Sequence, residues 1–198
     1  MNLKDFKKEY LSQYILIEKD FRDTNDYVSM SENNYKTFSA VYLKLLLSIG
    51  SEVDVVEQLL CELLHTDKAH FNEVEPDFYS ILVEVENYDI ILSPWKFDGN
   101  YPNWWTAYNE IKHNRNCVAE KFDKSKKYFE FANLENVLNA LAGLFSLELL
   151  AYKKIADENK DEMFVPDIHS IFNIKNLYWE NVRVAGSYIY INDKTYLI

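Results

Sequence analysis

The sequence predicts a mainly α-helical protein, an antiparallel helical bundle with a small β-hairpin or meander at its C-terminus. First, 48% of the 198 residues are hydrophobic and 16% are aromatic, which is enough for a packed core. Second, only 4 Gly and 4 Pro are present, too few for the many turns of an all-β fold. Third, apolar residues recur every three or four positions through most of the chain, which is the spacing of one helix face.

Two helices in the first third of the chain follow from this spacing. Residues 3–22 place apolar side chains on one face and Lys and Glu on the other, and a polar, turn-rich segment follows. Residues 38–63 form a second, longer helix with an almost unbroken apolar stripe. Gly50 costs this helix roughly 1 kcal/mol relative to Ala, which is tolerable where a close neighbouring helix needs the space.

Two further helices are expected after a short helix that begins at Pro76 and a loop that contains NYDIILSPWKFDGNYP. Asn103 is a suitable N-cap for a helix over residues 104–120. Asn133 is a suitable N-cap for the last helix, which continues to residue 156. The helix over residues 38–63 and this last helix carry the longest apolar stripes, so we expect them to be the central, most buried pair.

The pattern changes after Glu162. The segment YWENVRVAGSYIYINDKTYLI alternates β-branched and aromatic residues, and Ala185-Gly186 and Asn192-Asp193 are turn signals, which together predict a small β-meander or hairpin. We therefore expect a helical domain over residues 1–160 and a β appendage over residues 161–198 that packs on it.

Charge and motif content narrow the possible classes of protein. The net charge of -11 disfavours nucleic-acid binding by the protein as a whole, so any polyanion site must be a local exception. Cys61 and Cys117 lie far apart, and we expect two free thiols. The sequence contains no Gly-rich phosphate loop or H-E-x-x-H helix, and we expect no cofactor and no metal. Without a signal peptide or an apolar run long enough for a membrane span, a cytoplasmic protein is expected.

One candidate site lies in WWTAYNEIKHNRN, residues 104–116. On a helical wheel the core-facing stripe of this helix contains Arg115 together with Trp104, Ala107, Tyr108, Ile111 and Val118. A second face carries Trp105, Asn109, Lys112 and Asn116, with His113 at its edge. This face is rich in hydrogen-bond donors and poor in carboxylates, so it suits an anion or a flat base better than a metal ion.

The charge near this helix supports that interpretation. Residues 110–127 contain six basic and three acidic side chains. Lysines at the end of a helix also complement its dipole, which explains the same residues without a ligand. A guanidinium on an apolar face needs a carboxylate partner, and Glu52, which lies at the edge of its own stripe, is the candidate partner of Arg115.

The helices NWWTAYNEIKHNRN, FANLENVLNALAGLF and FSAVYLKLLLSIGSEVDVVEQLLC together resemble the HEPN superfamily of prokaryotic helical domains. The resemblance covers about residues 1–156. It implies a bundle that commonly dimerises. In many members it also implies a metal-independent ribonuclease, with its active site at the dimer seam, in phage defence and toxin–antitoxin systems. The family signature is an arginine followed four to six residues later by a histidine, whereas this chain carries the reversed, tighter His113-x-Arg115.

The resemblance leads to two hypotheses. In the first, the chain is an effector that binds and cleaves RNA: two copies bring their sites together, His113 shuttles the proton and Lys112 or Arg115 stabilises the phosphorane. The remaining candidates would contact the substrate, namely Trp105, Tyr108, Asn109 and Asn116. In the second, the chain is a catalytically inactive module for dimerisation or for binding a protein encoded nearby, and the same charged residues brace the bundle.

Overall fold

The computed structural model describes residues 1–68, 71–159, 170–174, 183–185, 188–191 and 194–197. The first helical run is continuous through α1 (Leu3–Phe6), the π-helical segment η1 (Lys7–Leu11) and α2 (Ser12–Asp23), which confirms the first predicted helix. It is followed by short 3₁₀ turns, η2 (Thr24–Asp26) and η3 (Glu32–Asn34).

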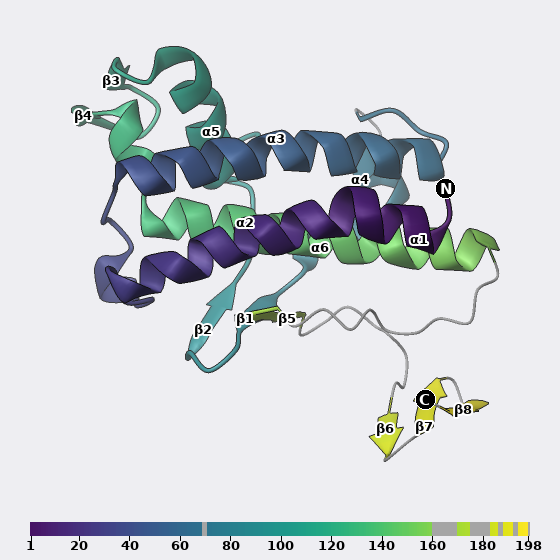
Figure 1. Ribbon diagram of the computed structural model, residues 1–198. Coiled ribbons are helices and arrows are strands. Elements are labelled where there is room, and N and C mark those ends of the chain that lie inside the picture. The colour runs from purple at the N-terminus through teal and green to yellow at the C-terminus, as the bar shows by residue number, and fades with distance from the viewer. Residues whose placement is uncertain (69–70, 160–169, 175–182, 186–187, 192–193, 198) are drawn as a thin grey trace.

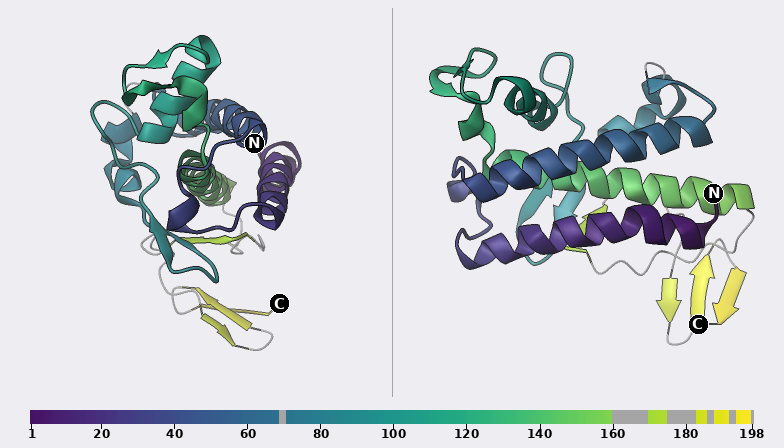
Figure 2. Two further views of the ribbon diagram at one scale, coloured as in Figure 1. Left: turned by 90° about the vertical axis from the view of Figure 1, so that its left-hand side faces the viewer. Right: turned by 45° about the horizontal axis from the view of Figure 1, so that its top comes forward.

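The two long helices form the centre of the protein, as predicted. In α3 (Ala40–Leu63) the Ser39 hydroxyl caps the first turn by accepting from the Tyr42 N–H at 3.0 Å. In α6 (Leu134–Asn159) the predicted cap forms, because the Asn133 side chain accepts from the Asn136 N–H at 3.0 Å. Figure 1 shows α3 and α2 lying alongside α6, and the end-on view in Figure 2 shows α6 surrounded by the other elements.

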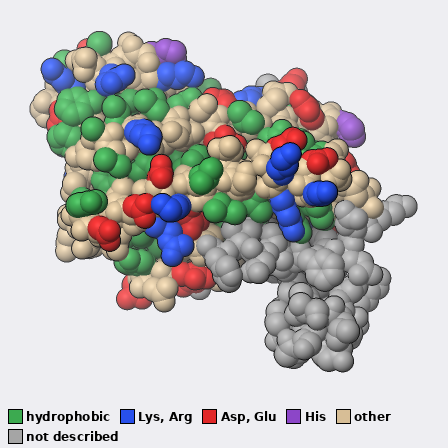
Figure 3. All heavy atoms as spheres, in the orientation of Figure 1, with side chains coloured by type: hydrophobic (Ala, Val, Ile, Leu, Met, Phe, Trp, Pro, Cys, Tyr) green, Lys and Arg blue, Asp and Glu red, His purple; other side chains and the backbone are tan. Residues whose placement is uncertain are grey.

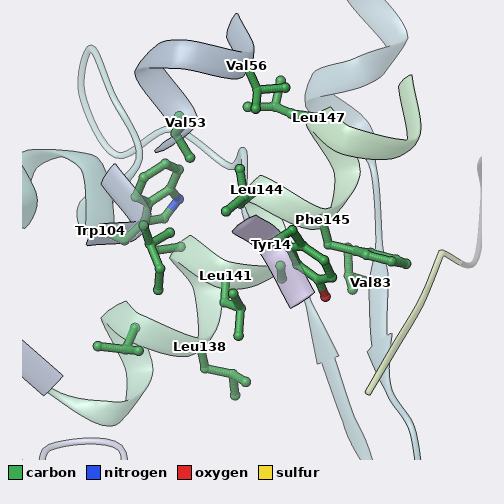
Figure 4. Packing of buried hydrophobic residues seen from close by; sticks show 14 of the residues in the cluster. Tyr14, Val53, Val56, Val83, Trp104, Leu138, Leu141, Leu144, Phe145 and Leu147 are labelled. Carbon is green, nitrogen blue, oxygen red and sulfur yellow. The ribbon is translucent and has the colours of Figure 1, made fainter. Parts of the chain in front are cut away.

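The core is built on α6. Figure 4 shows Trp104 lying near Val53, and Tyr14 lying beside Phe145. The ring centroids of Tyr14 and Phe145 are 5.6 Å apart. Because residues along most of α6 are buried on every side, its sequence is apolar around the whole helix. Among the described residues α6 is long and apolar enough to cross a membrane, but 89% of its apolar window is buried inside the protein, as in the core helix of a soluble protein.

A small sheet covers one side of α6, and the sequence did not predict its first two strands. After α4 (Phe71–Val74) and η5 (Pro76–Ser80), a 3₁₀ helix that confirms the short helix expected at Pro76, come β1 (Val83–Val85) and β2 (Ile90–Leu92). β5 (Phe172–Ile174) completes the antiparallel order β2-β1-β5. Phe172 packs on Phe145 of α6, with ring centroids 5.8 Å apart.

The C-terminal residues form the predicted β-meander. β6 (Arg183–Ala185), β7 (Tyr188–Ile191) and β8 (Lys194–Leu197) pair antiparallel in that order. Gly186 and the turn Asn192-Asp193 lie outside the described residues. The division into two domains at residue 160 stays a prediction, although β5, which falls in the predicted appendage, shares a sheet with β1 and β2.

Candidate functional site

Helix α5 (Asn103–Asn114) crosses α3 and α6 and carries most of the predicted site residues. Its buried face is Trp104, Ala107, Tyr108 and Ile111, as predicted. The Tyr108 ring lies directly on Gly50 of α3, where an added Cβ would come closer than 3.0 Å to ring atoms. Gly50 is therefore the close approach expected from the sequence. The helix begins one residue earlier than predicted, with Pro102 and not Asn103 at the N-cap position.

A polar chain runs along one flank of α5. Lys112 Nζ donates to the Tyr108 hydroxyl at 3.2 Å and lies 5.3 Å from the centroid of that ring. The Tyr108 hydroxyl in turn donates to Asp54 Oδ2 at 3.5 Å, and Asp54 pairs with Lys68 at 2.9 Å. Asp54 lies one turn after Gly50 on α3, so the gap that admits the tyrosine ring also brings this carboxylate to α5.

The predicted pair between Arg115 and Glu52 is not formed. Arg115 is exposed, and no described residue forms an ion pair with it. Glu52 is half-buried, and burial raises the pKa of its carboxyl above the ordinary value. Its charge acts instead on Glu148 of α6, whose pKa it helps to raise. The acid on α3 that reaches α5 is Asp54.

This error follows from the predicted length of the helix. We expected it to continue to residue 120, whereas α5 ends at Asn114. The backbone beyond it turns into the hairpin of β3 (Val118–Ala119) and β4 (Asp123–Lys127). The Phe129 N–H donates to the Arg115 carbonyl at 3.0 Å, and the Tyr128 N–H donates to the Cys117 carbonyl at 3.1 Å. Arg115 follows the last residue of the helix, and both Arg115 and Val118 are exposed.

The end of α5 and the hairpin form a surface that we call the basic lobe. Its members are Lys112, His113, Arg115, Lys124 and Lys127, and all five are exposed. None of the Lys and Arg side chains among them forms an ion pair with a described residue. The neighbouring lysines are neutralised, since Lys121 pairs with Glu110 at 2.5 Å and Lys126 lies 3.9 Å from Asp123. Figure 3 shows Lys and Arg side chains and one histidine gathered over this part of the molecule.

The other predicted contact residues divide between two places. Trp105 is half-buried and packs on Tyr108, with ring centroids 5.2 Å apart. Tyr108 is only 2% exposed, so its ring serves packing and not the base contact expected of it. Asn109 donates its side-chain amide to the Trp105 carbonyl at 3.0 Å, inside its own helix. Asn116 is exposed beside Arg115.

Two features near this surface were not predicted. Lys124 and Lys127 were counted in the basic stretch over residues 110–127, but their place on a strand, β4, was not expected. Asp54 was not among the residues selected from the sequence, although its position four residues after Gly50 was a signal for contact with α5. Cys61 and Cys117 are free thiols, as predicted. In the described part of the chain, no three His, Cys, Asp or Glu side chains are grouped to hold a metal ion.

Comparisons with protein-family models, with curated proteins and with solved structures found no match to this chain.

Proposed function

We propose that the protein binds single-stranded RNA through the basic lobe and cleaves it by metal-independent acid–base chemistry. One observation carries the proposal: a chain of net charge -11 keeps Lys112, Arg115, Lys124 and Lys127 exposed and without acidic partners among the described residues. Cations placed in this way supply the phosphate contacts that dominate affinity for nucleic acid. The resemblance to the HEPN superfamily points to the same class of ligand.

His113 is the proposed proton-transfer group because it is exposed within the same lobe. In RNA cleavage the ribose 2′-OH attacks phosphorus, the P–O5′ bond breaks, and a 2′,3′-cyclic phosphate and a 5′-OH are formed. One group must take the 2′-OH proton and another must donate a proton to O5′. A neutral His113 in one copy and a protonated His113 in a second copy would supply the two roles, and the neighbouring cations would stabilise the phosphorane.

Dimerisation is therefore part of the proposal. Half-exposed apolar side chains on α2 and α3 support it: Ile15, Leu16, Val41 and Val55. Figure 3 shows hydrophobic side chains over these two helices, which face the viewer. A self-association surface of this kind also favours the second candidate function, a catalytically inactive module that pairs with itself or with a partner protein.

Cleavage of a labelled 20-nucleotide RNA in the presence of EDTA tests the proposal. We expect products that end in a 2′,3′-cyclic phosphate, and we expect His113→Ala to abolish them while RNA binding is retained. His65→Asn is the matched control, because His65 is exposed and its φ of 54° is a conformation that Asn tolerates. If the wild-type protein binds RNA without cleaving it, the proposed catalysis is wrong. If it neither binds nor cleaves RNA, the second candidate function, a catalytically inactive module, is favoured.

A further inference from the structure

A cavity of about 460 Å³ lies between α3, the loop over residues 93–102 and the start of α5. Aromatic side chains form most of its wall: Tyr79, Trp95, Phe97, Tyr101 and Trp105. Phe97 and Tyr101 are about half exposed at its mouth. Tyr101 packs on no other ring of the described residues and is 57% exposed, which leaves part of its ring open to a flat ligand.

The loop that carries these rings is held in place before any ligand arrives. The Trp95 indole N–H donates to Ser146 Oγ of α6 at 2.8 Å, and the Trp104 indole N–H donates to the Pro94 carbonyl at 2.6 Å. Between these anchors the chain turns at Gly99, whose φ of 80° is one that other residues rarely adopt. A preformed aromatic wall binds a planar ring without the entropic cost of ordering a loop.

The remaining wall of the cavity is polar, and it has hydrogen-bonding capacity to spare. Lys68 Nζ lies 2.9 Å from Asp54 Oδ1 and 3.2 Å from Glu57 Oε2. These are the two partners of Lys68 among the described residues, and they leave one N–H of its ammonium group available. Glu57 Oε1 has no hydrogen-bond partner among the described residues. The cavity therefore offers one donor next to a carboxylate acceptor.

The charges that line the cavity balance, because the Glu57 carboxylate is offset by the Lys68 ammonium group. An aromatic cavity with uncompensated carboxylates would favour a cationic ligand. Balanced charges favour a neutral planar ring that carries its own donors and acceptors.

We propose that this cavity binds a guanine base. Guanine presents the O6 acceptor beside the N1–H and N2–H donors, which matches the free Lys68 N–H beside the Glu57 carboxylate. Uracil offers only one donor on that edge, and adenine and cytosine each place an acceptor where guanine carries N1–H. Unpaired bases of single-stranded RNA are recognised in this way, by stacking on aromatic rings and by hydrogen bonds to the Watson–Crick edge.

The position of the cavity connects it to the basic lobe, and the biological role of guanine binding rests on the proposed RNA binding. Trp105 lines the cavity, and Lys112 follows it by seven residues on α5, a rise of about 10 Å. A strand lying along α5 can place one base in the cavity and its neighbouring phosphates over the lobe. The RNA substrate would then be selected for a guanine at one position.

Titration with guanosine, which carries no phosphate, tests the cavity independently of the basic lobe. Trp95 and Trp105 line the cavity, so their fluorescence should change on binding, and calorimetry gives the affinity. We expect guanosine to bind about tenfold or more tightly than adenosine, cytidine or uridine. Glu57→Gln should weaken guanosine binding by a similar factor. Tyr101→Ala should weaken it through lost stacking, while Tyr27→Ala, at an exposed tyrosine outside the cavity, should not.

Equal affinity for the four nucleosides, or guanosine binding that Glu57→Gln leaves unchanged, would overturn the proposal. Saturable binding of choline in place of guanosine would identify a cation site and overturn it as well. If guanosine does not bind while a uridine-only RNA does, the guanine site fails and the RNA-binding proposal stands. If guanosine binds while the uridine-only RNA does not, RNA binding by the basic lobe is rejected and the guanine site stands.

Discussion

Glu148 carries a carboxyl group inside the core that makes no hydrogen bond with a described residue. Its side chain is 0% exposed, and the half-buried Glu52 on α3 adds a like charge. Burial first, and Glu52 second, raise the pKa of Glu148 from 4.5 to about 8. Because the folded-state pKa is raised, the group costs no stability below pH 4.5, and the free energy of unfolding falls as the pH rises from about 4.5 to about 8.

Glu148→Gln removes this titration while keeping the shape of the side chain. At pH 7 the solution is about 2.5 pH units above the ordinary pKa, and at 1.36 kcal/mol per unit the native carboxyl costs on the order of 3 kcal/mol. We therefore expect the variant to gain about 3 kcal/mol over the wild type at pH 7 relative to the difference measured at pH 4.5. Comparing the two pH values cancels any constant cost of burying the amide.

Urea unfolding followed by circular dichroism at both pH values measures this gain. Glu158→Gln is the matched control, because Glu158 lies on the same helix but is exposed, and its substitution should give the same difference at both pH values. Glu52→Gln should recover part of the gain by removing the neighbouring charge. A Glu148→Gln difference that does not change between pH 4.5 and pH 7 would refute the reasoning.

Two further predictions concern α5, and one concerns assembly. Gly50→Ala should lower the free energy of unfolding by about 1–3 kcal/mol, since its Cβ would overlap the Tyr108 ring, and urea unfolding checks this. Arg115→Ala should change the free energy of unfolding by less than about 0.5 kcal/mol in the same assay. The guanidinium is exposed, and its removal leaves no carboxylate of the described residues unpaired. Light scattering should report twice the chain mass of 23.5 kDa, and a monomer at all concentrations would exclude the composite site.

The parts of the fold that the sequence predicted are those fixed by local patterns. α3 and α6 carry long apolar stripes, and Asn133 is a local capping signal, so each could be identified from a few turns of chain. β1 and β2 were missed because each has three residues, too few for an alternating pattern to stand out. Their pairing also depends on distant residues, such as Val83 opposite Ile174.

The exposure of the candidate site residues was predicted correctly within α5 but not beyond its end. Lys112 and His113 lie on the exposed part of α5, as the wheel placed them. Arg115 was placed in the core because the wheel was continued past Asn114, where tertiary hydrogen bonds to the segment after β4 end the helix. Lys112 and His113 in the last turn and Asn116 just beyond it are the local signals that could have marked this end.

The salt dependence of RNA binding tests the central claim most directly. Fluorescence anisotropy of a labelled 20-nucleotide uridine RNA between 50 and 300 mM NaCl gives the slope of log K against log[salt]. Neutralising each phosphate contributes about -0.7 for a single strand, so Lys124→Ala/Lys127→Ala should reduce the magnitude of the slope by about 1.4. Lys4→Ala/Lys8→Ala, at exposed lysines of the first helical run, should leave it unchanged. Equal slopes for the two double variants, or no binding by the wild type at 50 mM NaCl, would contradict the account.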